Sequence, residues 1–138
     1  MSQKILAYLE DVQNDKPNVT SIRLVYKKLG PIEAQFIADS LVDNTHVTMV
    51  RLDCNNLGDR GAQIIAEGLR YNKYVTELNL ATNGIHDEGL CAIADMLKFN
   101  STLQILKINH NSGHDKSASA FGDALKVNKV KIFRSSLC

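Results

Sequence analysis

Residues 75–102 read VTELNLATNGIHDEGLCAIADMLKFNST, and this 28-residue design occurs four times in succession along the chain. The copies open, each 28 residues after the last, at Val19, Val47, Val75 and Leu103. A fixed period of this length is typical of stacked supersecondary units, in which each unit packs against its neighbours. The repeat therefore predicts the fold class more firmly than any single motif does.

The first half of each unit has the alternation of a β-strand. Leu78 and Leu80 flank Asn79, so a period of two places both leucines on one face of the strand. Across the units these positions form two apolar columns: Ile22, Val50, Leu78 and Leu106, and then Leu24, Leu52, Leu80 and Ile108. With Asn83 and Ile85, the segment matches the L-x-x-L-x-L-x-x-N-x-L pattern of a leucine-rich repeat.

The second half of each unit has the period of a helix. Leu90, Ile93, Ala94 and Leu97 are spaced as one apolar stripe on a helical surface. The last position of this stripe forms a third apolar column, which we expect to be buried: Leu41, Leu69, Leu97 and Leu125.

Strand followed by helix, repeated, predicts an α/β leucine-rich repeat solenoid. Parallel strands sit about 4.8 Å apart, whereas helices need roughly 10 Å each, so the stack must curve with its strands inside. We therefore predict a short right-handed βα horseshoe with a concave parallel sheet and outer helices. The predicted divisions of this single domain, 1–138, are a capping helix in 1–18, repeats at 19–46, 47–74, 75–102 and 103–129, and a partial strand in 130–138.

Polar residues also recur in columns. Asn55, Asn83 and Asn111 follow the strands, where a side-chain amide can satisfy the backbone groups of a bend; Lys27 interrupts this column, which predicts a less regular first turn. A second column lies where each helix must stop, and we expect left-handed backbone there: Asn44, Asn72, Asn100 and Asn128. The carboxylates that begin the helices are expected to cap them: Asp59, Asp87 and Asp115.

The two ends differ from the repeats. Ile5, Leu6, Leu9 and Val12 have helical spacing after Ser2, a possible N-cap, which predicts a helix that covers the first repeat. From Val130 onward only VKIFRSSLC remains, enough for a strand but not for a further helix. We expect this edge either to continue in a longer natural chain or to pair with another molecule, including self-association.

The composition excludes several classes of function. The 138 residues include 16 Lys and Arg against 15 Asp and Glu, a formal net charge of +1, whereas a general nucleic-acid binder carries a clear basic excess. No apolar run approaches the roughly 20 residues needed to span a bilayer, and no secretory signal is visible. The scattered Cys54, Cys91 and Cys138 indicate free thiols. We predict a cytoplasmic protein without nucleic-acid or membrane partners.

Several stretches resemble known leucine-rich repeat families. LGDRGA at residues 57–62 and IHDEGL at 85–90 are similar to the ribonuclease-inhibitor-like subfamily. Within that group, DKPNVTSIRL at 15–24, FIADSLVDNTHV at 36–47 and IADMLKFNSTL at 93–103 resemble the leucine-rich domain of tropomodulin and leiomodin. This resemblance implies a cytoskeletal role at the slow-growing, pointed end of actin filaments.

The concave face of the predicted sheet is the candidate binding surface, because curvature gathers side chains from several repeats around one partner. Arg23 and Arg51 are expected to stand one strand apart, which favours an acidic partner or local carboxylates. Tyr26, Met49 and Ile105 are apolar or aromatic residues on this face, the types enriched at interface centres. The full set of candidate partner-binding residues is Arg23, Tyr26, Met49, Arg51, Asp53, Glu77, Asn79, Ile105 and Lys107.

Catalytic and metal sites are not indicated. Cys54 and His110 lie two repeats apart, about 10 Å by strand spacing, which is too far for a nucleophile and its base. His86, His110 and His114 offer a weak metal-ligand pattern that is better explained by turns beside helix starts.

We therefore predict a non-enzymatic protein–protein interaction module without a metal or other cofactor. The alternative is a tropomodulin-like cytoskeletal regulator that binds actin filament pointed ends. A hydrolase that uses Cys54 or the histidines is the remaining, least favoured hypothesis.

Overall fold

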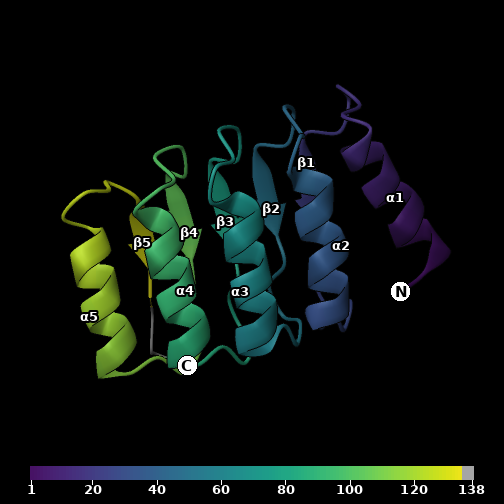
Figure 1. Cartoon of the computed structure of the whole chain (residues 1–138). Coiled ribbons are helices and arrows are strands. Elements are labelled where there is room, and N and C mark those ends of the chain that lie inside the picture. Colours follow the sequence, from purple (N-terminus) through teal and green to yellow (C-terminus); the bar gives the residue numbers. More distant parts are fainter. Residues whose placement is uncertain (135–138) are drawn as a thin grey trace.

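The computed structural model describes residues 1–134, in which helices and strands alternate along the chain (Figure 1). The helices are α1 (Gln3–Gln13), α2 (Pro31–Leu41), α3 (Gly58–Leu69), α4 (Asp87–Leu97) and α5 (Asp115–Ala124). The strands are β1 (Ser21–Arg23), β2 (Met49–Arg51), β3 (Glu77–Asn79), β4 (Ile105–Lys107) and β5 (Lys131–Phe133). Cys138, predicted to be a free thiol, lies outside the described residues.

The five strands form one parallel sheet in the order in which they occur in the chain. Ser21 pairs with Met49, Met49 with Glu77 and Glu77 with Ile105, so the register follows the 28-residue period. The last pairing, of Ile105 with Lys131, is two residues shorter. The helices stand side by side on one face of this sheet (Figure 1), and we call the opposite face the concave face. The predicted leucine-rich repeat solenoid is confirmed.

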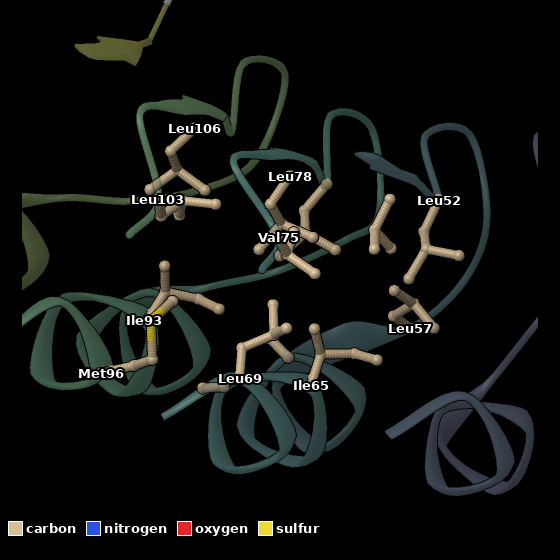
Figure 2. Close-up of a cluster of buried hydrophobic side chains, with 14 of the residues drawn as sticks. Leu52, Leu57, Ile65, Leu69, Val75, Leu78, Ile93, Met96, Leu103 and Leu106 are labelled. Carbon is tan, nitrogen blue, oxygen red and sulfur yellow. The ribbon is translucent and has the colours of Figure 1, made fainter. Parts of the chain in front are cut away.

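The core lies between the sheet and the helices, where the predicted apolar columns meet. Val50, Leu78 and Leu106 have no exposed surface, and Leu52 and Leu80 lie beside them with none either. Figure 2 shows the strand leucines pointing toward Ile65 and Leu69 of α3 and Ile93 of α4. Each repeat therefore fills part of an interior that it shares with its neighbours.

One member of the third apolar column was predicted wrongly. Leu41, Leu69 and Leu97 are buried, whereas Leu125 is 45% exposed at the end of α5. No helix packs beyond α5 within residues 1–134, and Phe121 and Ala124 supply the buried surface of this helix instead.

The asparagines at the helix ends do not adopt left-handed backbone, so that prediction was also wrong. Each is a buried amide that bonds to the preceding repeat. Asn100 Nδ2 donates to the carbonyl oxygens of Leu69 (2.6 Å) and Asn72 (3.1 Å), and Asn100 Oδ1 accepts from the backbone N–H of Leu103. Asn44, Asn72 and Asn128 bond in the same manner, so this column ties consecutive helix ends together.

The helix-start carboxylates also act between repeats rather than within them. Asp59, at the start of α3, accepts from the backbone N–H groups of His86 and Gly89 at the start of α4, both at 2.8 Å. Asp87 does the same for His114 and Ser117 of the next repeat. The predicted capping is therefore corrected for Asp59 and Asp87: each caps the helix of the following repeat.

Despite Lys27, the first turn is held in the same way as the third, in which Asn111 Oδ1 accepts from the N–H groups of Asn83 and Ile85. Asn55 Oδ1 accepts from the N–H groups of Lys27 (2.9 Å) and Leu29 (3.1 Å), while its Nδ2 donates to the Leu24 carbonyl (2.7 Å). The amide that completes each turn comes from the following repeat, so the first repeat needs no asparagine of its own. The expected irregularity was wrong for this reason.

Helix α1 packs against α2 at the start of the stack. Ser2 Oγ accepts from the N–H of Ile5, as an N-cap does, and Leu9 and Val12 are buried. The loop after α1 is held by Asp15, whose carboxylate accepts from Thr45 N (2.8 Å) and Thr45 Oγ1 (2.7 Å) and contacts His46 Nδ1 (2.9 Å).

These contacts predict a pH-dependent stability. The Thr45 backbone N–H, followed by the His46 and Thr45 side chains, lowers the pKa of Asp15 to about 2. A carboxyl group with a depressed pKa stabilises the fold above its unfolded pKa of about 3.9, and this contribution is lost as pH falls toward 2. We expect Asp15→Asn to flatten the fall in stability over this pH window, measured by urea unfolding at several pH values. The exposed Asp43 provides a control: Asp43→Asn should keep the wild-type slope, and an unchanged slope in Asp15→Asn would contradict the assignment.

A candidate protein-binding face

The concave face is built from two outward positions on each strand. Because side chains alternate across a strand, the residues that flank each buried centre form rows across the sheet. One row contains Ser21, Met49, Glu77, Ile105 and Lys131, and the other contains Arg23, Arg51, Asn79, Lys107 and Phe133. The structure thus brings the predicted strand residues onto one surface, including the adjacent pair Arg23 and Arg51.

Ion pairs organise the charges on this face. The Arg51 guanidinium lies 3.1 Å from the Asp53 carboxylate and donates to it through two nitrogens. Lys107 Nζ lies 3.3 Å from Glu77 Oε1 on the neighbouring strand. We call the row that contains Arg23, Arg51 and Lys107 the basic row. The two anions reduce repulsion within it, and they leave Arg23 as an exposed cation whose Nε donates to Ser21 Oγ.

The nine predicted residues differ in how much surface they offer. Tyr26 is 78% exposed, whereas Asp53 (8%) and Asn79 (7%) are buried. Asn79 Oδ1 accepts from the backbone N–H of Ala81, so this amide supports the end of β3. Met49, Arg51, Glu77, Ile105 and Lys107 are half-buried, which leaves each of them partly available to a partner.

Two residues of the last strand were missing from the predicted set. Lys131 extends the row of Ile105, and Phe133, 42% exposed, extends the row of Lys107. The sequence already predicted a strand at 130–133, so the period of two was the signal that could have included them. With these residues, and with Asp53 and Glu77 as the anions, the surface carries more cations than anions.

A further shared feature was not predicted. Four residues, each three positions after the end of a strand, have left-handed backbone, with φ between 54° and 60°: Tyr26, Cys54, Thr82 and His110. Such conformations are uncommon outside glycine and asparagine and are held by surrounding structure. Tyr26 and Cys54 are close enough that the Cys54 thiol raises the pKa of the Tyr26 hydroxyl. Residue type gave no signal here, since these four side chains share no preference for left-handed backbone.

Two of the histidines considered as metal ligands lie at helix starts, outside the strand rows of the concave face. His86 and His114 are exposed N-cap residues of α4 and α5. Across residues 1–134, no three His, Cys, Asp or Glu side chains converge as a metal site would require. The described helices include none that is long and apolar enough to cross a membrane.

Comparisons with a family model and with solved structures both find similarity to known proteins. Residues 2–130 match the family model described as the TMOD/LMOD leucine-rich domain. A solved structure, "Leiomodin-1 Actin-Binding Site 2 (ABS2)", superposes with a TM-score of 0.89 at 26% sequence identity, and the match covers 100% of this chain and 83% of that one. A search of curated proteins finds no significant match.

Proposed function

Because the chain belongs to the tropomodulin/leiomodin leucine-rich domain family, we propose that it binds actin through its concave face. The family match spans residues 2–130, and it is the observation that carries this proposal. The solved domain that resembles the whole chain is named as an actin-binding site of leiomodin-1. Both findings support the cytoskeletal alternative over the more general interaction module that we favoured from the sequence.

The chemistry of the concave face supports a protein partner with acidic groups. Arg23 is an exposed cation at one end of the basic row, and Lys131 is exposed beyond the last ion pair. Met49 and Ile105 lie between them with part of their apolar surface open. Apolar centres with charged surroundings are typical of transient protein interfaces. An actin-binding role also supports the cytoplasmic location predicted from the free thiols.

Actin assembly provides the test of this function. Filament seeds blocked at their fast-growing ends elongate only at the pointed ends, and their growth can be followed with fluorescent actin. We expect the chain to slow this growth in a saturable manner, because a domain bound at the filament end obstructs incoming subunits. Growth that is unchanged at chain concentrations well above that of the seeds would contradict the proposal.

A further inference from the structure

The first strand has an unpaired outer edge at the start of the described sheet, whereas β2, β3 and β4 are paired on both sides. Leu24 N donates to the Arg51 carbonyl (2.9 Å) and Tyr26 N donates to the Asp53 carbonyl, so each repeat offers these two acceptors to the repeat before it. The equivalent acceptors of the first repeat are the Arg23 and Val25 carbonyls. No strand precedes β1 in the described sheet, so these carbonyls face away from it.

Helix α1 covers only the beginning of this edge. The Tyr8 hydroxyl donates to the Ser21 carbonyl and lies within hydrogen-bond reach of the Arg23 backbone N–H. The tyrosine of the capping helix thus makes a hydrogen bond that a preceding strand would otherwise make, and it protects the beginning of the edge from pairing with another strand. The end of the edge, at Arg23 and Val25, stays open.

Two adjoining hollows lie along this open edge. The first, of about 370 Å³, is lined by Lys4, Ile5, Tyr8, Ser21, Arg23 and Leu24. The second, of about 550 Å³, shares Lys4 and Ile5 with the first and continues past Tyr26, Lys27, Lys28 and Leu29. Both volumes fall within the roughly 300–1,000 Å³ of typical binding pockets.

Among the charged side chains that line the hollows, cations outnumber carboxylates. Four cations line them: Lys4, Arg23, Lys27 and Lys28. Glu33 is the one carboxylate among the lining side chains, and it is engaged with the Gly30 N–H at 2.8 Å, a bond that lowers its pKa. An occupant with several carboxylates would therefore meet cations that have few anions of their own nearby.

We propose that the hollows bind an extended acidic segment of a protein partner, with an apolar side chain seated between α1 and β1. Its carboxylates would contact Lys4, Arg23, Lys27 and Lys28, and its backbone N–H groups would donate to the free carbonyls of the β1 edge. Ile5, Tyr8 and Leu24 provide the apolar floor. This site does not rest on actin binding, although it shares Arg23 and Tyr26 with the residues predicted for the concave face.

A designed peptide tests the site without actin. The probe is a fluorescein-labelled ten-residue peptide of alternating glutamate and leucine, whose period of two separates charge from apolar surface in an extended chain. Its matched controls alternate glutamine with leucine and glutamate with serine. We expect the probe to bind at least about tenfold more tightly than either control, because each control loses either the ion pairs or the apolar burial. Equal binding of the glutamate–serine peptide would overturn the proposal in favour of unspecific charge attraction.

Variants of the protein locate the binding. The double variant Lys4→Glu with Lys27→Glu should bind the probe with an affinity lower by about tenfold or more, since two attractive contacts become repulsive. Lys73→Glu with Lys129→Glu makes the same change of charge at exposed lysines outside the hollows and should bind the probe as wild type does. Circular dichroism melting shows whether each variant is folded. Equal loss of probe affinity in both variants would overturn the assignment to a peptide. The same would follow if the protein bound phosphatidylserine vesicles in place of the probe, with the same dependence on Lys4 and Lys27.

Discussion

Asn83→Ala should lower the free energy of unfolding by roughly 2–4 kcal/mol, because buried backbone groups would lose their partners. Asn83 has no exposed surface. Its Nδ2 donates to the carbonyls of Leu52 (2.9 Å), Leu80 (3.2 Å) and Ala81 (3.2 Å), and its Oδ1 accepts from Leu57 N (3.3 Å). Every buried side-chain nitrogen and oxygen in the described part of the chain has a hydrogen-bond partner, so this network has no spare donors. Urea unfolding followed by circular dichroism measures the loss.

A nearby asparagine provides the control for this experiment. Asn56 is exposed, and Asn56→Ala should change the stability by no more than about 0.5 kcal/mol, as surface substitutions usually do. If Asn83→Ala lowered the free energy of unfolding as little as Asn56→Ala does, the amide column would not hold the repeats together.

The second large effect concerns actin binding. Arg23→Glu combined with Arg51→Gln should weaken the affinity for actin by roughly tenfold to a hundredfold while the melting temperature changes little. Glutamine is chosen at position 51 because glutamate would stand against the buried Asp53 carboxylate, 3.1 Å from the Arg51 guanidinium in the wild type. Titration of fluorescent actin with each protein measures the affinity.

The control for the basic row makes a similar change on the helical side. Arg60→Glu with Lys98→Gln removes the same number of charges from α3 and the end of α4. This variant should bind actin as wild type does. Equal weakening by both variants would point to net charge alone, and no weakening by the first variant would remove the basic row from the proposed site.

The periodicity predicted the fold because a position that is buried in every repeat requires an apolar residue in every repeat. Leu78 and Leu80 recur at fixed positions since each repeat must fill the same part of a shared interior, and the structure buries them as expected. Leu125 fits the same pattern but is exposed, because its environment depends on what packs beyond α5. A column in the sequence therefore predicts burial well in the middle of a stack and less well at its end.

The direction of the polar contacts could not be predicted from the same columns. Asn55, Asp59 and Asn100 recur at a constant spacing whether they bond within their own repeat or to a neighbour. Only the three-dimensional structure shows that Asn55 and Asn100 bond to the preceding repeat and Asp59 to the following one. This distinction matters physically, because contacts between repeats make the stability of each unit depend on the next.

The candidate site was predictable in outline. A period of two in short strands is enough to place Arg23 and Arg51 abreast on one face. The ion pair of Arg51 with Asp53 is one of the local carboxylate contacts that the adjacent arginines favoured. The left-handed backbone of Tyr26 depends on three-dimensional packing, and its residue type gives no sign of it. The hollows beside α1 were missed because they form between the capping helix and the first repeat, where the period does not apply.

Oxidative footprinting by hydroxyl radicals tests the central claim, that the concave face contacts actin, most directly. The method reads the exposure of individual side chains by mass spectrometry, and the chain carries reactive groups on both sides. The partly open Met49 reports on the concave face, and Tyr26 (78% exposed) reports on the turn that follows β1. Tyr71 (72%) and Phe99 (51%), whose rings contact each other at a centroid distance of 6.2 Å, report on the helix ends. We predict that saturating actin slows the oxidation of Tyr26 and Met49 and leaves Tyr71 and Phe99 unchanged. Protection of Tyr71 and Phe99 with undiminished oxidation of Tyr26 and Met49 would contradict the account.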